Sequence, residues 1–447
     1  MTEPIISVSG LRGIVGESLT PPVAARYVAA LARALPPGPL VVSRDGRTSG
    51  PMLAEIVCGT LAACGRNVLY ANVAATPTLG VLVRQHEAAG GVQISASHNP
   101  APYNGLKLFN AVGRVLPAAA GQPVLAAYRE SSAPWAAFDK LGSVSTIADT
   151  TGEHLRLILA AVDAATIRRR SFRVLLDSNA GAGSLLGLQL LAALGCQVSI
   201  LGQQPTGQFL HPPEPTAENL AGVGEQVTAA KADVGFCQDP DADRLAIIDE
   251  NGRYLGEEYT LAICLDHALR QRKGPVVTNC ATSRMSEDLA QIYGVPFHRA
   301  AVGEANVVDQ MLAQRAVFGG EGSGGPIDPR VGLVRDSFVG MALLLAAMAT
   351  RNRPVSELAA ELPRYEIVKR TVNLAVEKLP AALAAVEQRF ADAKADRLDG
   401  LRLDWPSRWL IVRGSNTEPI VRIIAEAPTA VAAEEMAAAA CDAVAGV

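Results

Sequence analysis

Short apolar runs that predict strands alternate with helical patterns of 10–15 residues along most of this 447-residue chain. The first cycle places strand patterns at 39–43, 67–70 and 91–94. A second cycle starts with the strand pattern at 172–176, and a third starts near residue 274. Strands separated by helices of this length indicate a mostly parallel sheet that is covered by helices. The alternation therefore predicts an α/β architecture that is repeated three times.

The pattern changes after about residue 363. Two strand patterns, at 409–413 and 420–425, are followed by an Ala-rich helix, which indicates a smaller α+β unit. At 447 residues the chain is too long for one hydrophobic core and has room for three or four domains. We predict three related α/β domains with mixed, mostly parallel sheets, and a smaller C-terminal α+β domain. The expected domains are residues 1–150, 151–252, 253–363 and 364–447.

Composition excludes several classes of protein. A net charge of −4 argues against a nucleic-acid-binding surface but leaves room for a local basic pocket that binds a small anion. The seven cysteines are scattered without a Cys-x-x-Cys pair, which favours reduced thiols in a cytoplasmic protein and indicates no zinc site. The start of the chain lacks the pattern of a signal peptide, and the longest apolar run, at 339–349, is too short for a membrane helix. We therefore expect a cytoplasmic protein without nucleic-acid or membrane partners.

A glycine-rich turn at 181–187 follows a strand pattern and precedes a helical one, as in dinucleotide-binding proteins. That fingerprint also requires an acidic residue at the end of the next strand, and the sequence there is Leu201-Gly-Gln203. A dehydrogenase is therefore disfavoured, and the glycines are explained by close packing of a helix on its strand.

The run Gly91–Lys107 contains a buried strand pattern followed by two turn-forming pairs, Asn-Pro and Asn-Gly. Ser97 and His98 are therefore expected where a strand opens into a surface loop, which is a common place for a reactive side chain. Local hydrogen bonds that tie a tight loop together explain the same residue types. From its residues alone this stretch leaves both interpretations open.

Asp239-Pro-Asp-Ala-Asp-Arg244 places three carboxylates at alternate positions of a short loop. Asp239, Asp241 and Asp243 can converge on one hard cation, and Mg²⁺ is the natural choice. The spacing also matches part of an EF-hand, but position 6 is Arg244 instead of Gly and a strand leads into the loop. A solvated acidic turn is the remaining alternative, although carboxylates this close repel one another without a cation.

The loop Gly319–Gly325 has five glycines, which allow the backbone to approach a ligand closely. Glu321 supplies an acceptor and Ser323 a hydroxyl, both suited to the hydroxyls of a sugar. A flexible turn without a ligand would have the same composition.

Arg413-Gly-Ser-Asn-Thr-Glu-Pro419 lies between two strand patterns. An arginine, two hydroxyls, an amide and free backbone N–H groups make a suitable nest for a phosphate dianion. A polar hairpin is the alternative. The candidate phosphate-binding residues are Arg413, Ser415, Asn416 and Thr417.

Together the four motifs resemble, in the same order and over nearly the whole chain, those of the α-D-phosphohexomutase family. The resemblance implies four domains around a central cleft, with Ser97 carrying a phosphoryl group and sharing a Mg²⁺ ion with Asp239, Asp241 and Asp243. It also implies sugar recognition by Glu321 and Ser323 and phosphate anchoring by residues 413–417. Further groups placed against the reacting phosphoryl are His98, Lys107, Arg12 and Arg244. We expect Lys107 to move a proton only if its pKa is lowered.

The implied activity is a Mg²⁺-dependent interconversion of hexose 6-phosphate and hexose 1-phosphate. It runs through phosphorylated Ser97 and a sugar bisphosphate, which also serves as activator, in a monomer or homodimer. The motif around Ser97 and the chain length resemble phosphoglucosamine mutases, whereas the motifs at 319–325 and 413–419 resemble phosphoglucomutase/phosphomannomutase members. We expect a phosphoglucosamine mutase, with phosphoglucomutase/phosphomannomutase as the alternative. A sugar-phosphate phosphatase and a non-catalytic binding protein are the alternatives from other classes. Many family members have His where this chain has Gly325, so the acid–base role credited to that His has no holder in the motif.

Overall fold

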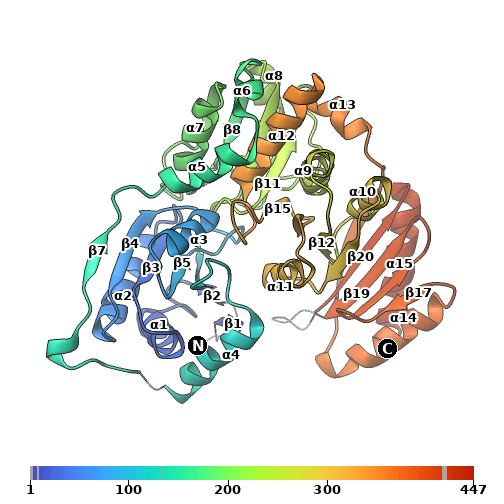
Figure 1. Cartoon of the computed structure of the whole chain (residues 1–447). Coiled ribbons are helices and arrows are strands. Elements are labelled where there is room, and N and C mark those ends of the chain that lie inside the picture. The colour runs from blue at the N-terminus through green and yellow to red at the C-terminus, as the bar shows by residue number, and fades with distance from the viewer. Residues whose placement is uncertain (1–3, 8–9, 132, 415–419) are drawn as a thin grey trace.

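A computed structural model describes residues 4–7, 10–131, 133–414 and 420–447 of the chain. These residues form four sheets, which follow one another along the chain. The four corresponding domains lie along an arc that runs from the N-terminal to the C-terminal domain (Figure 1). The arc brings the first and last domains to the two ends of one concave arrangement.

The first domain is built on a seven-stranded mixed sheet with the order β1-β2-β6-β5-β3-β4-β7. Strands β5, β3, β4 and β7 are parallel, whereas β1, β2 and β6 run antiparallel to their neighbours. The strands are β1 (Ile5–Ser7), β2 (Gly10–Ile14), β3 (Leu40–Arg44), β4 (Val68–Val73), β5 (Gly90–Ile94), β6 (Tyr103–Asn110) and β7 (Val144–Thr146).

Both faces of this sheet are covered, as the alternating side chains of β3 show. Leu40 and Val42 pack into a core with α1, α2 and α4, whereas Val41 packs with α3 on the opposite face. Adjacent prolines start α1, where the missing N–H has no helical partner to lose. The helices are α1 (Pro21–Ala34), α2 (Gly50–Ala63), α3 (Thr76–Gln85) and α4 (Ala118–Glu130), followed by a short 3₁₀ turn, η1 (Phe138–Lys140).

The second and third domains each contain a four-stranded sheet with one antiparallel edge strand, β11 and β15 respectively. The second sheet has the order β11-β10-β8-β9 and the third β13-β12-β14-β15. The strands are β8 (Arg173–Asp177), β9 (Gln197–Leu201), β10 (Val234–Gln238), β11 (Leu245–Ile248), β12 (Val276–Asn279), β13 (Phe297–Ala300), β14 (Phe318–Glu321) and β15 (Gly325–Ile327).

One continuous apolar core joins these two domains. It contains Phe172 and Leu176 of the second domain together with buried residues of α9 and α12. Asp336 caps α12 by accepting hydrogen bonds from Phe338 N and Val339 N. The helices are α5 (Gly152–Ala161), α6 (Ala164–Arg168), α7 (Gly183–Ala193), α8 (Ala221–Ala229), α9 (Glu257–Gln271), α10 (Met285–Tyr293), α11 (Glu304–Gln314), α12 (Ser337–Arg351) and α13 (Val355–Ala360).

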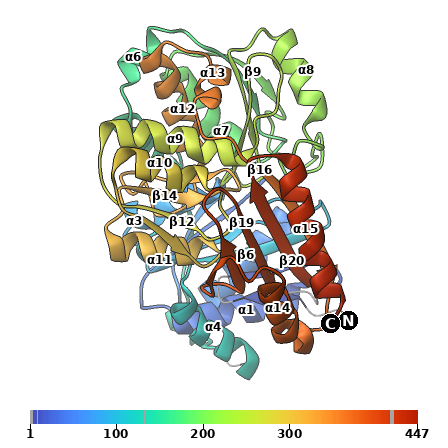
Figure 2. The same ribbon diagram turned by 90° about the vertical axis from the view of Figure 1, so that its right-hand side faces the viewer.

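The C-terminal domain has a five-stranded antiparallel sheet with the order β16-β20-β19-β18-β17. Helices α14 and α15 contribute Val386 and Ala437 to the core of this domain, and Figure 2 shows both helices beside the sheet. The elements are β16 (Glu366–Asn373), β17 (Lys394–Asp396), β18 (Leu401–Asp404), β19 (Trp409–Gly414), β20 (Ile420–Ala427), α14 (Leu379–Arg389), α15 (Ala430–Ala445) and the 3₁₀ turn η2 (Val376–Lys378).

The predicted fold class is confirmed: three α/β domains with mixed sheets precede a smaller α+β domain. In the described part of the chain, no helix combines the length and apolar character needed to cross a membrane. All seven cysteines are unpaired.

Candidate active site

Ser97 lies in the loop between β5 and β6. Its backbone has a left-handed φ of 49°, which is costly for a non-glycine residue and is typical of functional sites. The Ser97 Oγ donates a hydrogen bond to Asp239 Oδ2 at 2.6 Å. The expectation of an exposed position is wrong for this side chain, because Ser97 is only 1% exposed where the Asp239–Asp243 loop of the second domain meets it.

A buried arginine, Arg47, fixes the backbone of this loop. Its guanidinium donates to four carbonyl oxygens, those of Ser97 at 2.7 Å, Asn99 at 2.5 Å, Pro100 at 2.9 Å and Tyr103 at 2.8 Å. One side chain thereby holds four carbonyls of the loop, although that of Pro100 also accepts from Tyr103 N at 3.0 Å.

Asp45 connects Arg47 to Ser97. Its Oδ2 accepts from Arg47 Nε at 3.2 Å and from Ser95 Oγ at 2.7 Å, and Ser95 Oγ in turn accepts from Ser97 N at 2.9 Å. Burial raises the pKa of Asp45 to about 6, and the Arg47 charge opposes that shift. Sequence reasoning missed both residues, although the charged run Arg44–Arg47 directly after the buried strand β3 was the available signal.

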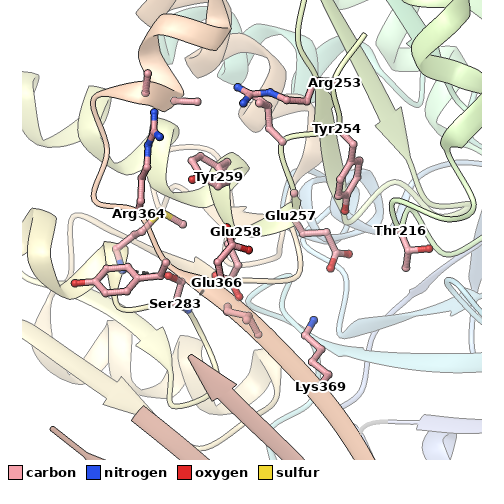
Figure 3. A pocket seen from close by; sticks show the side chains of 17 residues that line it. Thr216, Arg253, Tyr254, Glu257, Glu258, Tyr259, Ser283, Arg364, Glu366 and Lys369 are labelled. Atoms are coloured by element: carbon pink, nitrogen blue, oxygen red, sulfur yellow. Dashed lines mark hydrogen bonds between the residues drawn. The ribbon is translucent and has the colours of Figure 1, made fainter. Parts of the chain in front are cut away.

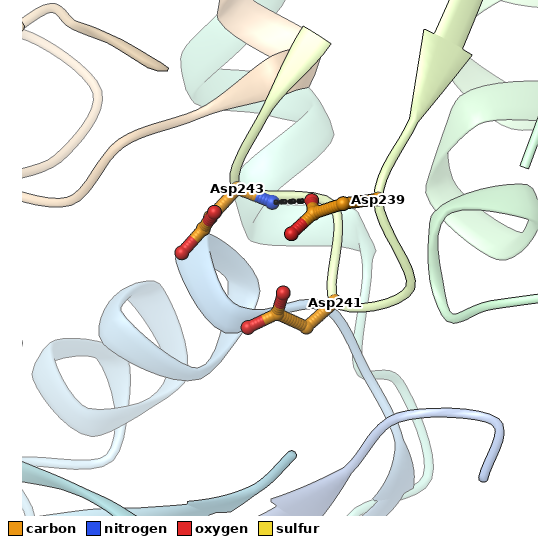
Figure 4. Close-up of side chains that lie close together, drawn as sticks. All are labelled: Asp239, Asp241 and Asp243. Carbon is orange, nitrogen blue, oxygen red and sulfur yellow. Dashed lines mark hydrogen bonds between the residues drawn. The ribbon is translucent and has the colours of Figure 1, made fainter. Parts of the chain in front are cut away.

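Asp239, Asp241 and Asp243 follow β10, and each is buried. Their carboxylates face one another, with ligand atoms within 4.8 Å (Figure 4). Asp239 Oδ1 accepts from Asp243 N at 3.1 Å and from Arg244 N at 3.0 Å, which shapes the loop. The Oδ1 atoms of Asp241 and Asp243 are buried and have no hydrogen-bond donor among the described residues. Orphaned carboxylate oxygens at close range fit a hard divalent cation.

Lys107, on β6, reaches this cluster from the first domain. Its Nζ donates to Asp241 Oδ2 at 2.7 Å and to Asp243 Oδ2 at 2.8 Å. Burial lowers the pKa of Lys107, but these two carboxylates outweigh burial and raise it. A lysine that moves a proton needs a lowered pKa, and that of Lys107 is raised, so Lys107 is a fixed cation here.

Two further cations and a neutral imidazole surround Ser97. Arg12 Nη1 donates to Asn99 Oδ1 at 3.2 Å, and Arg244 Nε lies 4.0 Å from Asp243 Oδ1. His98 Nδ1 lies 3.3 Å from Ser97 Oγ. Burial, followed by the charges of Arg244 and Arg12, lowers the pKa of His98 to about 2, so its ring is neutral.

Arg335, which sequence reasoning missed, joins Glu321 and Ser323 to Asp243 of the second domain. Arg335 Nη1 donates to Glu321 Oε2 at 2.8 Å and to Ser323 Oγ at 3.4 Å. Its Nη2 donates to Asp243 Oδ2 at 2.7 Å, and its Nε to Glu304 Oε2 at 2.9 Å. The only signal in the sequence was the Arg335-Asp336 pair directly before the apolar helix α12.

Arg413 lies at the end of β19, in the C-terminal domain. Its Nε donates to Asp399 Oδ2 at 3.1 Å, and the same oxygen accepts from Val302 N at 3.0 Å. This shared acceptor joins the C-terminal domain to the third. Ser415, Asn416 and Thr417 lie outside the described residues.

A cavity of about 600 Å³ adjoins the loop that carries Glu321. Glu258, which lines the cavity, lies so close to Gly322 that a Cβ there would be 2.0 Å from Glu258 Oε1. Lys369, on β16, points into the cavity toward Glu257 (Figure 3). Burial raises the pKa of Glu258 to about 8. Acidic and basic groups from the third and fourth domains therefore meet in this space.

The site combines a hydroxyl, a carboxylate cluster in which two oxygens lack a hydrogen-bond donor among the described residues, and cations fixed around them. Phosphoryl transfer requires this combination, because its catalysis consists mainly of positioning and of neutralising charge on the phosphoryl oxygens. The geometry is therefore that of a phosphotransferase.

Comparison with known families places the chain within that class. Models of the phosphoglucomutase/phosphomannomutase domains match in order: alpha/beta/alpha domain I at residues 5–134, domain II at 152–252, domain III at 257–365 and the C-terminal domain at 372–443. The chain belongs to the phosphoglucomutase/phosphomannomutase family and is an enzyme of the phosphohexomutase type, as the sequence predicts.

Curated relatives and solved structures agree with this assignment. A probable phosphoglucosamine mutase of Thermococcus gammatolerans is 34% identical, over 96% of this chain and 95% of its own. A phosphoglucomutase/phosphomannomutase of Thermococcus kodakarensis is 36% identical, over 95% of each chain. The structure of a putative phosphomannomutase from Thermus thermophilus superposes with a TM-score of 0.86 over 100% of both chains at 24% identity.

Proposed function

We propose that this enzyme interconverts the 6-phosphate and the 1-phosphate of glucosamine, with Ser97 as the phosphoryl carrier. One observation carries the proposal: the Ser97 hydroxyl is buried and hydrogen-bonded at 2.6 Å to a carboxylate of the three-aspartate cluster. A phosphoserine here carries nearly two negative charges, so it requires a cation between itself and the cluster.

Asp239, Asp241, Asp243 and Ser97 are the proposed ligands of that cation, and Mg²⁺ fits their all-oxygen donor set. The orphaned Oδ1 atoms of Asp241 and Asp243 support this assignment. When bound, Mg²⁺ would draw electron density from the phosphoryl oxygens and offset their charge. Burial, then repulsion by Asp241 and Asp243, raises the pKa of Asp239. Burial also acts on the other two aspartates, but Lys107 outweighs it and lowers the pKa of Asp241, and Arg335 and Lys107 lower that of Asp243.

The remaining residues of the first two domains have proposed roles in orientation. Arg47 holds the Ser97 loop, so that Oγ keeps one position through the reaction. Arg12 and Arg244 are cations for the phosphoryl oxygens, and Lys107 keeps Asp241 and Asp243 in place. His98 is neutral and 3.3 Å from Ser97 Oγ, so it can hydrogen-bond the phosphoserine oxygen without adding charge.

The two remaining loops have proposed roles in binding the sugar. Phospho-Ser97 transfers its phosphoryl group to the free hydroxyl of a sugar monophosphate, giving a bisphosphate that must turn over before it returns the other phosphoryl. Glu321 and Ser323 are the proposed contacts to sugar hydroxyls in both orientations. Arg413 and the segment that follows it are the proposed anchor of the phosphate that is not reacting.

The relatives support two substrate classes. The name of the Thermococcus gammatolerans relative supports glucosamine phosphate, whereas that of the Thermococcus kodakarensis relative, at 36% identity, supports glucose and mannose phosphates. The test is a coupled assay with the 6-phosphates of glucosamine, glucose and mannose, run with Mg²⁺ and a trace of the sugar bisphosphate. We expect the largest kcat/KM for glucosamine phosphate. A larger value for glucose or mannose phosphate would overturn the substrate, and release of orthophosphate without isomerisation would indicate a phosphatase.

A further inference from the structure

Gly325 is required by space and not by backbone conformation. Its φ does not lie in the left-handed region that favours glycine. A Cβ built at Gly325 would lie 2.4 Å from Arg335 Cδ, 2.8 Å from its Cγ and 3.0 Å from its Cβ. Real Cβ contacts are not this short, and the nearest part of Arg335 is its stem, which cannot swing aside without moving the guanidinium. Any side chain at position 325 is therefore incompatible with the observed Arg335.

Arg335 is committed to carboxylates on every side. Its side chain is 10% exposed, and each of its three nitrogens donates to a different acidic residue. The partners are Asp243 at 2.7 Å, Glu321 at 2.8 Å and Glu304 at 2.9 Å. The planar fork of an arginine satisfies three directions at once, whereas a lysine ammonium is a single point charge.

These partners belong to different parts of the active site. Asp243 follows β10 in the second domain and is a proposed metal ligand, whereas Glu321 ends β14 in the third domain and is a proposed sugar contact. Gly303 N also donates to Glu321 Oε1, at 3.1 Å, which ties the loop before α11 to the same carboxylate. Arg335 is therefore a direct link between the two loops.

We propose that Arg335 is a positioning residue that sets the proposed sugar loop, residues 319–325, relative to the proposed metal loop, residues 239–243, and that Gly325 is glycine to leave room for it. The kinetic part of this inference rests on the proposed function. Position 325 carries no side chain, so the stem of Arg335 can occupy the adjacent space. The prediction that follows is a specific energetic coupling between positions 325 and 335.

A double-mutant cycle of Gly325→Ala and Arg335→Ala measures that coupling. In the wild-type background Gly325→Ala should displace Arg335 and lower kcat/KM by about 100-fold, the scale expected when reacting groups are misplaced. In the Arg335→Ala background the same change should cost less than about 3-fold. Gly222→Ala is the control, since a Cβ there meets nothing within 4 Å. Equal costs of Gly325→Ala in both backgrounds would overturn the proposal.

The Mg²⁺ affinity of Arg335 variants distinguishes a positioning role of Arg335 from mere support of the fold. Arg335→Ala removes a cation that competes for Asp243, so calorimetry should show Mg²⁺ binding about 3- to 10-fold tighter although kcat falls. Weaker Mg²⁺ binding together with lower kcat would mean that Arg335 only maintains the fold. Arg335→Lys keeps the charge but not the fork, so its kcat should lie between those of the wild type and Arg335→Ala.

The cycle also stands apart from the proposed function. If the wild type isomerises none of the three hexose phosphates, the proposed function fails, and the coupling is then measured by thermal unfolding. The inference predicts that Gly325→Ala lowers the melting temperature in the wild type and has little effect in Arg335→Ala. If Arg335→Ala does not fold, Arg335→Lys takes its place: the flexible stem of a lysine should tolerate Gly325→Ala better than the anchored arginine does, and an undiminished penalty contradicts the inference.

Discussion

The Ser97 loop and the Asp239–Asp243 loop touch at one hydrogen bond, yet their interiors are built in opposite ways. In the first, Arg47 and Asp45 satisfy the loop carbonyls and the Ser95 hydroxyl. In the second, buried oxygens of two aspartates have no donor among the described residues, although Lys107 and Arg335 already contribute two positive charges.

The chain's own residues pair the polar groups of the Ser97 loop, whereas the Asp239–Asp243 loop keeps carboxylate oxygens without a donor. A loop whose polar groups are all paired holds one geometry without a ligand. A cluster with orphaned carboxylate oxygens is stable only at a cost, which a cation would remove. The chain thus fixes the proposed phosphoryl carrier itself and leaves the proposed metal loop to be completed by an ion.

The largest effect is expected at the contact between the two loops. Ser97→Ala removes the proposed carrier, so turnover should fall by at least about 1,000-fold, because no other group forms the covalent intermediate. The protein should still fold, with a loss of about 1–3 kcal/mol in thermal unfolding, because buried Asp239 Oδ2 loses its hydrogen-bond donor. Ser184→Ala, which removes a buried Oγ that has no hydrogen-bond partner among the described residues, is the matched control. Retained turnover in Ser97→Ala would refute the assignment.

Arg47→Met disrupts the Ser97 loop and leaves the Asp239–Asp243 loop intact. Because four carbonyls lose the hydrogen bond from Arg47, Ser97 Oγ should move, and kcat should fall about 100-fold. Mg²⁺ affinity, measured by calorimetry, should fall by less than about 10-fold, because the neutral Ser97 ligand is displaced while the three aspartates, which Arg47 does not contact, stay in place. A large loss of Mg²⁺ affinity would show that the two loops are not built independently.

The fold and the four motifs could be predicted from the sequence, whereas side chains that act on loops far away in the chain could not. Motifs such as Ser95–Pro100 and Asp239–Arg244 carry their chemistry in neighbouring residues, and the alternation of strands and helices predicts the three α/β domains. Arg47 and Arg335 act on loops 50 and 92 residues away, those of Ser97 and Asp243. A lone arginine has no local pattern, because its partners are brought to it only by tertiary packing.

Burial was also beyond the sequence. Ser97 stands in a turn-rich segment whose composition predicts exposure, and only the contact with Asp239 of another domain covers it. The same contact between domains explains Lys107. Its pKa is raised because two aspartates from the second domain outweigh its desolvation, and neither is near it in sequence. The roles proposed for Glu321, Ser323 and Arg413 remain predictions.

Asp241→Asn tests the proposed Mg²⁺ site in the Asp239–Asp243 loop. One of three anionic ligands becomes neutral, so Mg²⁺ affinity should fall by about 10- to 100-fold in calorimetry. Asp249→Asn, at a buried aspartate outside the cluster, should leave it unchanged. Unchanged Mg²⁺ affinity in Asp241→Asn would remove this residue from the ligand set.

The smallest effect concerns the segment that covers Arg47. Phe209 lies under the Arg47 guanidinium at 5.1 Å, and nearby His211 Nε2 pairs with Asp177 Oδ2 at 2.7 Å. Burial lowers the pKa of His211, but the hydrogen bond and charge of Asp177 outweigh it and raise it. The stabilisation is therefore full below the unfolded pKa of about 6.5 and is lost as pH rises through the raised pKa. Unfolding by urea should show His211→Gln closing its stability gap to the wild type over that rise; a gap independent of pH would contradict it.

Phosphorylation of the dephosphorylated enzyme tests most directly whether Ser97 is the phosphoryl carrier and whether the Asp239–Asp243 loop needs a cation. Dephosphorylated enzyme is mixed with a sugar bisphosphate, with Mg²⁺ or with a chelator, and the modified peptide is identified by mass spectrometry. We expect one phosphoryl group per chain, on Ser97, in the sample with Mg²⁺ and none in the sample with the chelator. Phosphate on Ser95, or equal phosphorylation of Ser97 in the chelator, would contradict it.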